Sequence, residues 1–215
     1  MFEMKFKIVQ ILENGGVITH YLKGKPRDVK LDILDFKKAS KKFEMFGKEG
    51  MIVWAEIPYI SEHLANGNEN TISQMKELVV QNYNHPSIVV WGLSNEIGIG
   101  GSDDDLLENH RILNDLVHEM DKTRLTTIAA VSMCKMTDPY LLIPDVVSYN
   151  HYFGWYGGET SMNGPWFDKF HETHPTIPIG CSEYGCEALN WHTSDPKQGD
   201  YTEEYQAFYH EELIK

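Results

Sequence analysis

Three carboxylates directly follow apolar runs that have the composition of buried strands. They are Glu56, Glu96 and Glu183. A carboxylate at the end of a buried strand is costly unless it is paired or hydrogen-bonded, so such residues are more often functional than decorative. A structural acid in a salt bridge explains any one of them equally well. The presence of both Glu96 and Glu183 favours a site that uses two carboxyl groups.

Glycoside hydrolysis is one reaction that needs two such groups, one protonated and one ionised, on either side of the scissile bond. A separation of about 5 to 5.5 Å implies retention of the anomeric configuration, whereas about 6.5 to 9.5 Å leaves room for an inverting water. Glu96 and Glu183 are far apart in the sequence. Only a fold that brings distant strand ends together can pair them.

The elements that could position these residues begin at residue 51, where short β-branched and aromatic runs alternate with longer amphipathic segments. That rhythm is typical of parallel βα units. The expected strands are 51–59, 88–93, 126–131, 146–149 and 177–182. The expected helices are 69–83, 103–121, 166–173 and 201–213, with a long loop over 157–165. In a barrel of such units every strand ends on one face, where catalytic residues collect.

Composition narrows the class of partner. The 215 residues include 19 Lys and Arg against 32 Asp and Glu, a net charge of −13 that disfavours nucleic acid and anionic membranes as partners. Nine of the basic residues lie within 22–50, where a solvated helix face is favoured over a binding patch. No apolar run approaches the ~18 residues of a membrane span. Three cysteines and no signal-peptide pattern predict a cytoplasmic location.

Three segments resemble the motifs of one enzyme family. Residues 84–96, which end in Ser94-Asn95-Glu96, resemble the acid/base signature of glycoside hydrolase family 2, the family of β-galactosidases, β-glucuronidases and β-mannosidases. Residues 182–185 resemble its nucleophile motif and residues 145–156 its strand-6 segment. The resemblance runs through most of 51–215, and its details lean toward the β-galactosidase branch. It implies an α/β fold, the (β/α)₈ TIM barrel.

The resemblance also implies a role for each site residue. Glu96 would act as general acid and then general base, and Glu183 as the nucleophile of a retaining double displacement on terminal non-reducing β-galactosides. Tyr152 would donate a hydrogen bond that keeps Glu183 ionised, and Asn95 would contact the sugar 2-hydroxyl. Among the aromatic residues of these segments, Trp155 is the expected platform for a sugar face.

The expected substrate is therefore a carbohydrate, and no cofactor is implied. The ten histidines show no His-x-x-x-His spacing, so no metal site is expected. His20 matches the family's second-strand motif and is an expected substrate-binding residue. Val17 stands where that motif has an arginine, so we expect Glu183 to lack this charge partner.

The resemblance weakens at both ends of the chain. Strands 3 to 7 are recognisable, but no segment matches strand 8, which predicts an incomplete barrel. Residues 1–50 form an atypical segment that could complete the barrel, and 51–215 form the glycoside hydrolase barrel region. The unpaired edges of such a barrel also favour a homo-oligomer. Two alternatives remain: a noncatalytic remnant that binds sugars weakly, and a β-glucuronidase.

Overall fold

The computed structural model describes residues 8–11, 17–20, 46, 48–189, 191–192 and 201–214. Within these residues one seven-stranded sheet has the order β2-β1-β3-β4-β5-β6-β7, and its last five strands are parallel and in chain order. These five are β3 (Val53–Glu56), β4 (Ile88–Asn95), β5 (Leu125–Val131), β6 (Val146–Asn150) and β7 (Ile179–Glu183). The sequence predicted all five.

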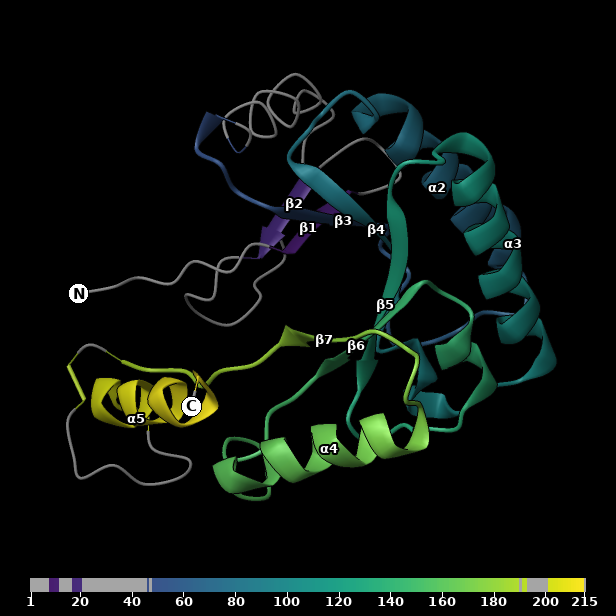
Figure 1. The fold of residues 1–215 in the computed structure, drawn as a ribbon. Coiled ribbons are helices and arrows are strands. Elements are labelled where there is room, and N and C mark those ends of the chain that lie inside the picture. The colour runs from purple at the N-terminus through teal and green to yellow at the C-terminus, as the bar shows by residue number, and fades with distance from the viewer. Residues whose placement is uncertain are drawn as a thin grey trace.

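The sheet curls, and its helices cover the outer side of the curl, as Figure 1 shows for α2, α3 and α4. The helix α5 lies past the end of β7. This is part of a TIM barrel, and no strand follows β7 in 191–192 or 201–214, so the predicted incomplete barrel is confirmed. The helices are α2 (Asn68–Asn82), α3 (Asp104–Met120), α4 (Asn163–Thr173) and α5 (Glu203–Ile214).

Residues 1–50 contribute two strands to the edge of this sheet. β1 (Ile8–Ile11) pairs with β3 in parallel, and β2 (Val17–His20) pairs with β1 in antiparallel. The parallel pairing lets the N-terminal segment extend the barrel strands by one. The boundary between 1–50 and 51–215 stays a prediction, since residues 21–45, which include most of the expected helix face within 22–50, lie outside the described residues.

Local sequence explains where the helices begin. The side chain of Asp103 accepts a hydrogen bond from the backbone nitrogen of Leu106 at 2.8 Å and caps α3, whose acidic first turn complements the helix dipole. Helix α4 begins before the predicted residue 166. Pro165 fits within its first turn because the missing N–H has no intrahelical partner there.

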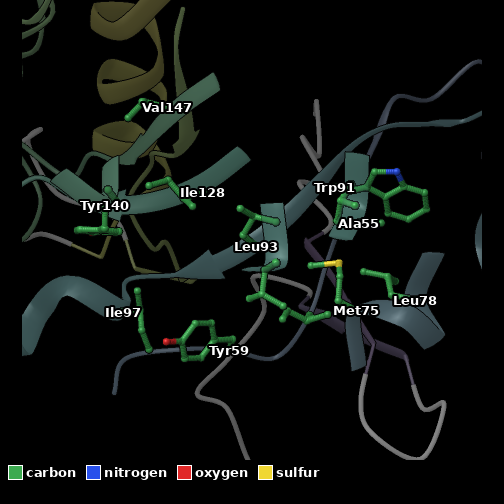
Figure 2. Close-up of a cluster of buried hydrophobic side chains, with 14 of the residues drawn as sticks. Ala55, Tyr59, Met75, Leu78, Trp91, Leu93, Ile97, Ile128, Tyr140 and Val147 are labelled. Atoms are coloured by element: carbon green, nitrogen blue, oxygen red, sulfur yellow. The ribbon is translucent and has the colours of Figure 1, made fainter. Parts of the chain in front are cut away.

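The core lies between the sheet and the outer helices, and it fixes which strand residues face inward. Figure 2 shows Ala55 and Trp91 beside Met75 and Leu78 of α2. Ala55 of β3 and Trp91 of β4 are paired in register. Because side chains alternate across a strand, the next register pair, Glu56 and Gly92, lies on the opposite, inner face of the curl.

A buried ion pair holds the start of β4 in place. Arg124 binds Asp121 at 2.7 Å and donates to the carbonyl oxygens of Ile88, Tyr83 and His85 at 2.7, 2.8 and 3.1 Å. Burial raises the pKa of Asp121, but hydrogen bonds from Thr123, Arg124 and Trp91 outweigh it and hold the pKa far below its usual value. The turn over 83–88 is therefore fixed at the start of β4, the strand that ends in the site motif.

None of the helices in the described part of the chain is both long enough and apolar enough to cross a membrane.

Candidate active site

The two predicted catalytic carboxylates lie at the carboxyl ends of their strands. Glu183 is the last residue of β7, and Glu96 directly follows β4. Burial raises the pKa of Glu183, a hydrogen bond from Tyr152 lowers it, and the charge of Glu96 raises it again. Glu96 is therefore close enough for its charge to act on Glu183. The fold brings the pair together as expected.

Tyr152 follows β6 and reaches across to the neighbouring strand. Its hydroxyl donates to Oε2 of Glu183 at 2.6 Å, a short distance typical of a hydrogen bond to an ionised oxygen. Burial, and then the charge of Glu183, raise the pKa of Tyr152 well above its ordinary value. Tyr152 therefore keeps its proton and favours the ionised form of Glu183.

Asn150 connects the two carboxylate strands. Its amide nitrogen donates to Oε1 of Glu96 at 3.0 Å and to Oδ1 of Asn95 at 3.2 Å. Its amide oxygen accepts from the Ser182 hydroxyl at 2.6 Å. Asn150 is 1% exposed, and each of its polar atoms is used. A continuous hydrogen-bonded chain thus runs from the end of β4 through β6 to the residue before Glu183.

Sequence reasoning missed Asn150 and Ser182 as site residues. Asn150 is the polar residue that ends the apolar run of β6, in the same way that Glu96 and Glu183 end theirs. It is paired in register with Glu183, so both side chains lie on the inner face. The strand-end pattern could have found Asn150 if it had been applied to amides as well as to carboxylates.

The backbone of Glu96 has a conformation that is unusual for a residue with a side chain. Its φ of 52° and ψ of 22° are left-handed, and its N–H donates to the carbonyl oxygen of Ala129 at 2.7 Å. This conformation costs on the order of 1 to 2 kcal/mol for a non-glycine residue. It ends β4 sharply and begins the short 3₁₀ helix η2 (Ile97–Gly100). The strained backbone therefore lies at Glu96, the residue expected to act as general acid and base.

The other three expected binding residues, Asn95, Trp155 and His20, have different surroundings. Asn95 is 9% exposed and its side chain accepts from Asn150. Trp155 is 8% exposed and packs against Tyr205 and Tyr201 near α5. His20 is the last residue of β2, and its side chain lies outside the described atoms. Sugar contact by each of these three stays a prediction.

In the described residues no three or more His, Cys, Asp or Glu side chains gather as a metal ion would require.

Comparison with known proteins defines the class. A family model described as glycosyl hydrolases family 2, TIM barrel domain, matches residues 38–215. This chain belongs to glycoside hydrolase family 2 and forms part of its barrel domain. The resemblance of the three motifs is thereby confirmed at the level of the family.

Two β-glucuronidases are among the proteins that this chain resembles. A β-glucuronidase of Bacteroides fragilis is 34% identical over 195 residues, which are 84% of this chain and 27% of that protein. The crystal structure of an FMN-binding β-glucuronidase from Facaelibacterium prausnitzii L2-6 matches with a TM-score of 0.77 and 52% identity, over 80% of this chain and 27% of the other. The chain thus spans about a quarter of the length of these relatives.

The predicted lean toward the β-galactosidase branch is wrong. The β-galactosidase of Thermoanaerobacterium thermosulfurigenes matches over 79 residues, only 36% of this chain, whereas the β-glucuronidase of Bacteroides fragilis matches over 84%. The physical reason is that the strand-end motifs resemble those that act at the anomeric carbon, which has the same configuration in β-galactosides and β-glucuronides. They carry little information about the rest of the sugar.

Proposed function

We propose that this chain carries the catalytic centre of a retaining β-glucuronidase, with a β-glucuronide as its carbohydrate substrate. The observation that supports it most is the hydrogen bond from Tyr152 to Glu183, together with the charge coupling of Glu183 to Glu96. The names of the relatives support the choice of sugar. The chain spans about a quarter of the length of those proteins, so β-glucuronidase activity is proposed for it and is tested below.

In this mechanism Glu183 attacks the anomeric carbon while the bond to the leaving oxygen breaks and Glu96 gives its proton to that oxygen. A water then loses a proton to Glu96 and attacks the same carbon, which frees the Glu183 carboxylate. Tyr152 holds Glu183 ionised before the attack, and Asn150 orients the Glu96 carboxyl group. The reaction needs one carboxyl group ionised and the other protonated, and the Tyr152 hydrogen bond supports the ionised form at Glu183.

A panel of 4-nitrophenyl β-glycosides tests both the reaction and the sugar. We expect turnover of the glucuronide to exceed that of the galactoside, the glucoside and the mannoside, and to be lost in Glu183→Gln. Preference for a neutral sugar would overturn the choice of substrate. Binding of a β-glucuronide with no turnover of any glycoside would overturn catalysis and favour a sugar-binding remnant.

The proposed location is the cytoplasm. Cys134, Cys181 and Cys186 form no disulfide, which supports this location.

The proposed assembly is a homo-oligomer. β7 has a strand neighbour on one side only among the described residues, which supports association of copies at that edge. Light scattering of the purified chain tests the association, and a monomer at all concentrations would contradict it.

A further inference from the structure

Glu56 is a buried carboxyl group that the proposed mechanism does not use. It ends β3, is 3% exposed, and lies on the inner face of the curl with Glu183. The indole nitrogen of Trp54, two residues earlier on the same face, donates to its Oε2 at 3.0 Å. Burial makes the charged form of a carboxyl group costly, so the protonation state of Glu56 has to be explained.

The neighbouring strand leaves space for this group. Gly92 of β4 is paired with Glu56, and a Cβ atom on Gly92 would lie 2.6 Å from Cβ and 2.8 Å from Oε2 of Glu56. The same atom would also collide with the indole nitrogen of Trp54. A side chain at residue 92 is therefore incompatible with the pair formed by Trp54 and Glu56.

The electrostatic surroundings of Glu56 favour its neutral form. Burial raises its pKa to about 8, although the Trp54 hydrogen bond lowers it and the charge of Glu183 raises it further. Among the described side chains, Glu183 is the charged group that acts on Glu56, and β4 places Gly92, which carries no side chain, at the position paired with Glu56. Glu56 is almost fully buried, whereas Glu183 is only half-buried and accepts a hydrogen bond from the Tyr152 hydroxyl. Of these two carboxyl groups, Glu56 is therefore the one that keeps its proton.

We propose that Glu56 is a positioning residue that stays protonated while Glu183 is ionised, so that the inner face presents one buried negative charge rather than two to an anionic sugar. The inference rests on the proposed function for the role of Glu183 and for the charge of the substrate. Its consequence is a loss of affinity for anionic sugars when Glu56 ionises at alkaline pH.

The first measurement follows binding of phenyl 1-thio-β-D-glucuronide, which is not hydrolysed and stays anionic throughout. From about pH 7 to about pH 9.5 we expect wild-type affinity to fall on the order of tenfold, the equivalent of one pKa unit of coupling. Glu56→Gln mimics the protonated acid, because its amide can accept from Trp54 and carries no charge. Its affinity should stay level, while the exposed control Glu77→Gln should behave as the wild type. A parallel fall in Glu56→Gln would overturn the proposal.

The second measurement needs no sugar and separates this inference from the proposed function. The unfolded chain releases the Glu56 proton near its ordinary pKa of 4.5 and the folded chain near 8, so the wild type loses stability relative to Glu56→Gln as the pH rises between these values. A gap in urea midpoint that widens over this range and then levels off supports the proposal. A gap that does not change with pH overturns it, whether or not the chain binds the thioglucuronide.

A third measurement needs no Glu56 variant, in case Glu56→Gln does not fold. It uses Glu96→Gln, which removes the proton of the proposed general acid. Infrared difference spectra of this variant at neutral pH should contain the C=O stretch of a protonated carboxylic acid, and the band should disappear as the pH rises through about 8. Absence of such a band at neutral pH would overturn the proposal. If Glu96→Gln shows the band but the wild type binds no thioglucuronide at any pH, the proposed function fails while the protonation of Glu56 stands.

Discussion

At the scale of single residues, opposing effects act on the pKa of Glu183. Burial and the charge of Glu96 raise its pKa, and the Tyr152 hydroxyl lowers it. A hydrogen bond to a charged group contributes about 1.5 to 3 kcal/mol, which is enough to decide the protonation state near neutral pH. Tyr152 is therefore the side chain whose removal should change the chemistry most without removing a carboxylate.

Tyr152→Phe should lower kcat/KM on a β-glucuronide by about 10- to 100-fold, because the ionised nucleophile loses its donor. The pKa of Glu183 then rises, so the acidic limb of the pH profile should move to higher pH. The check is a pH profile of kcat/KM for this variant and for Tyr156→Phe, a neighbouring and exposed tyrosine. An unmoved acidic limb in Tyr152→Phe would contradict the role assigned to the hydroxyl.

Asn150→Ala removes the connection between the two carboxylate strands. It leaves the Ser182 hydroxyl and one Glu96 oxygen without their partner, so we expect a loss of about 1 to 3 kcal/mol in unfolding free energy as well as slower turnover. Urea titration and steady-state kinetics measure the two effects, with the exposed Asn70→Ala as the control. Full activity in Asn150→Ala would show that Glu96 does not need this contact.

At the scale of elements, the turn before β4 fixes where the acid/base residue arrives. Arg124 joins three carbonyl oxygens of that turn to Asp121, and all these groups lie at the opposite end of β4 from Glu96. A strand whose start is held in this way places its last residue reproducibly. The ion pair thus belongs to the framework of the site, although it touches no part of it.

Arg124→Ala should lower the unfolding free energy by about 3 to 5 kcal/mol, because it leaves Asp121 as an uncompensated buried charge. Arg111→Ala breaks an exposed pair with Glu108 that spans 3.6 Å and should cost less than about 1 kcal/mol. Urea unfolding of the two variants gives the comparison directly. Equal losses would contradict the structural importance of the pair at Arg124.

The five strands could be predicted because each is a run of apolar and β-branched residues, and four of them end in a polar residue: Glu56, Asn95, Asn150 and Glu183. The sequence also indicated that Glu96 and Glu183 would meet, since parallel strands end on one face. The left-handed backbone of Glu96 could not be predicted, because it depends on the carbonyl of Ala129 in the next strand. The bonds of Asn150 were equally hidden, since they join three strands that are distant in sequence.

At the scale of the whole molecule, the chain includes the proposed reaction centre and spans about a quarter of the length of the β-glucuronidases that it resembles. In the proposed mechanism the two carboxylates act at the anomeric carbon, whose configuration β-galactosides and β-glucuronides share, so the motifs that carry them do not distinguish the two sugars. The motifs therefore defined the family, while the predicted galactoside had to be corrected by comparison with the β-glucuronidases.

The most direct test of the central claim is covalent trapping of the nucleophile. A 2-deoxy-2-fluoro-β-glucuronyl fluoride reacts with the nucleophile but forms an intermediate that turns over slowly. Peptide mapping by mass spectrometry of the labelled chain should place the added mass on Glu183, and Glu183→Gln should take up none. Labelling of Glu56 or Glu187 instead, or no labelling of the wild type, would contradict the assignment of Glu183 as the nucleophile.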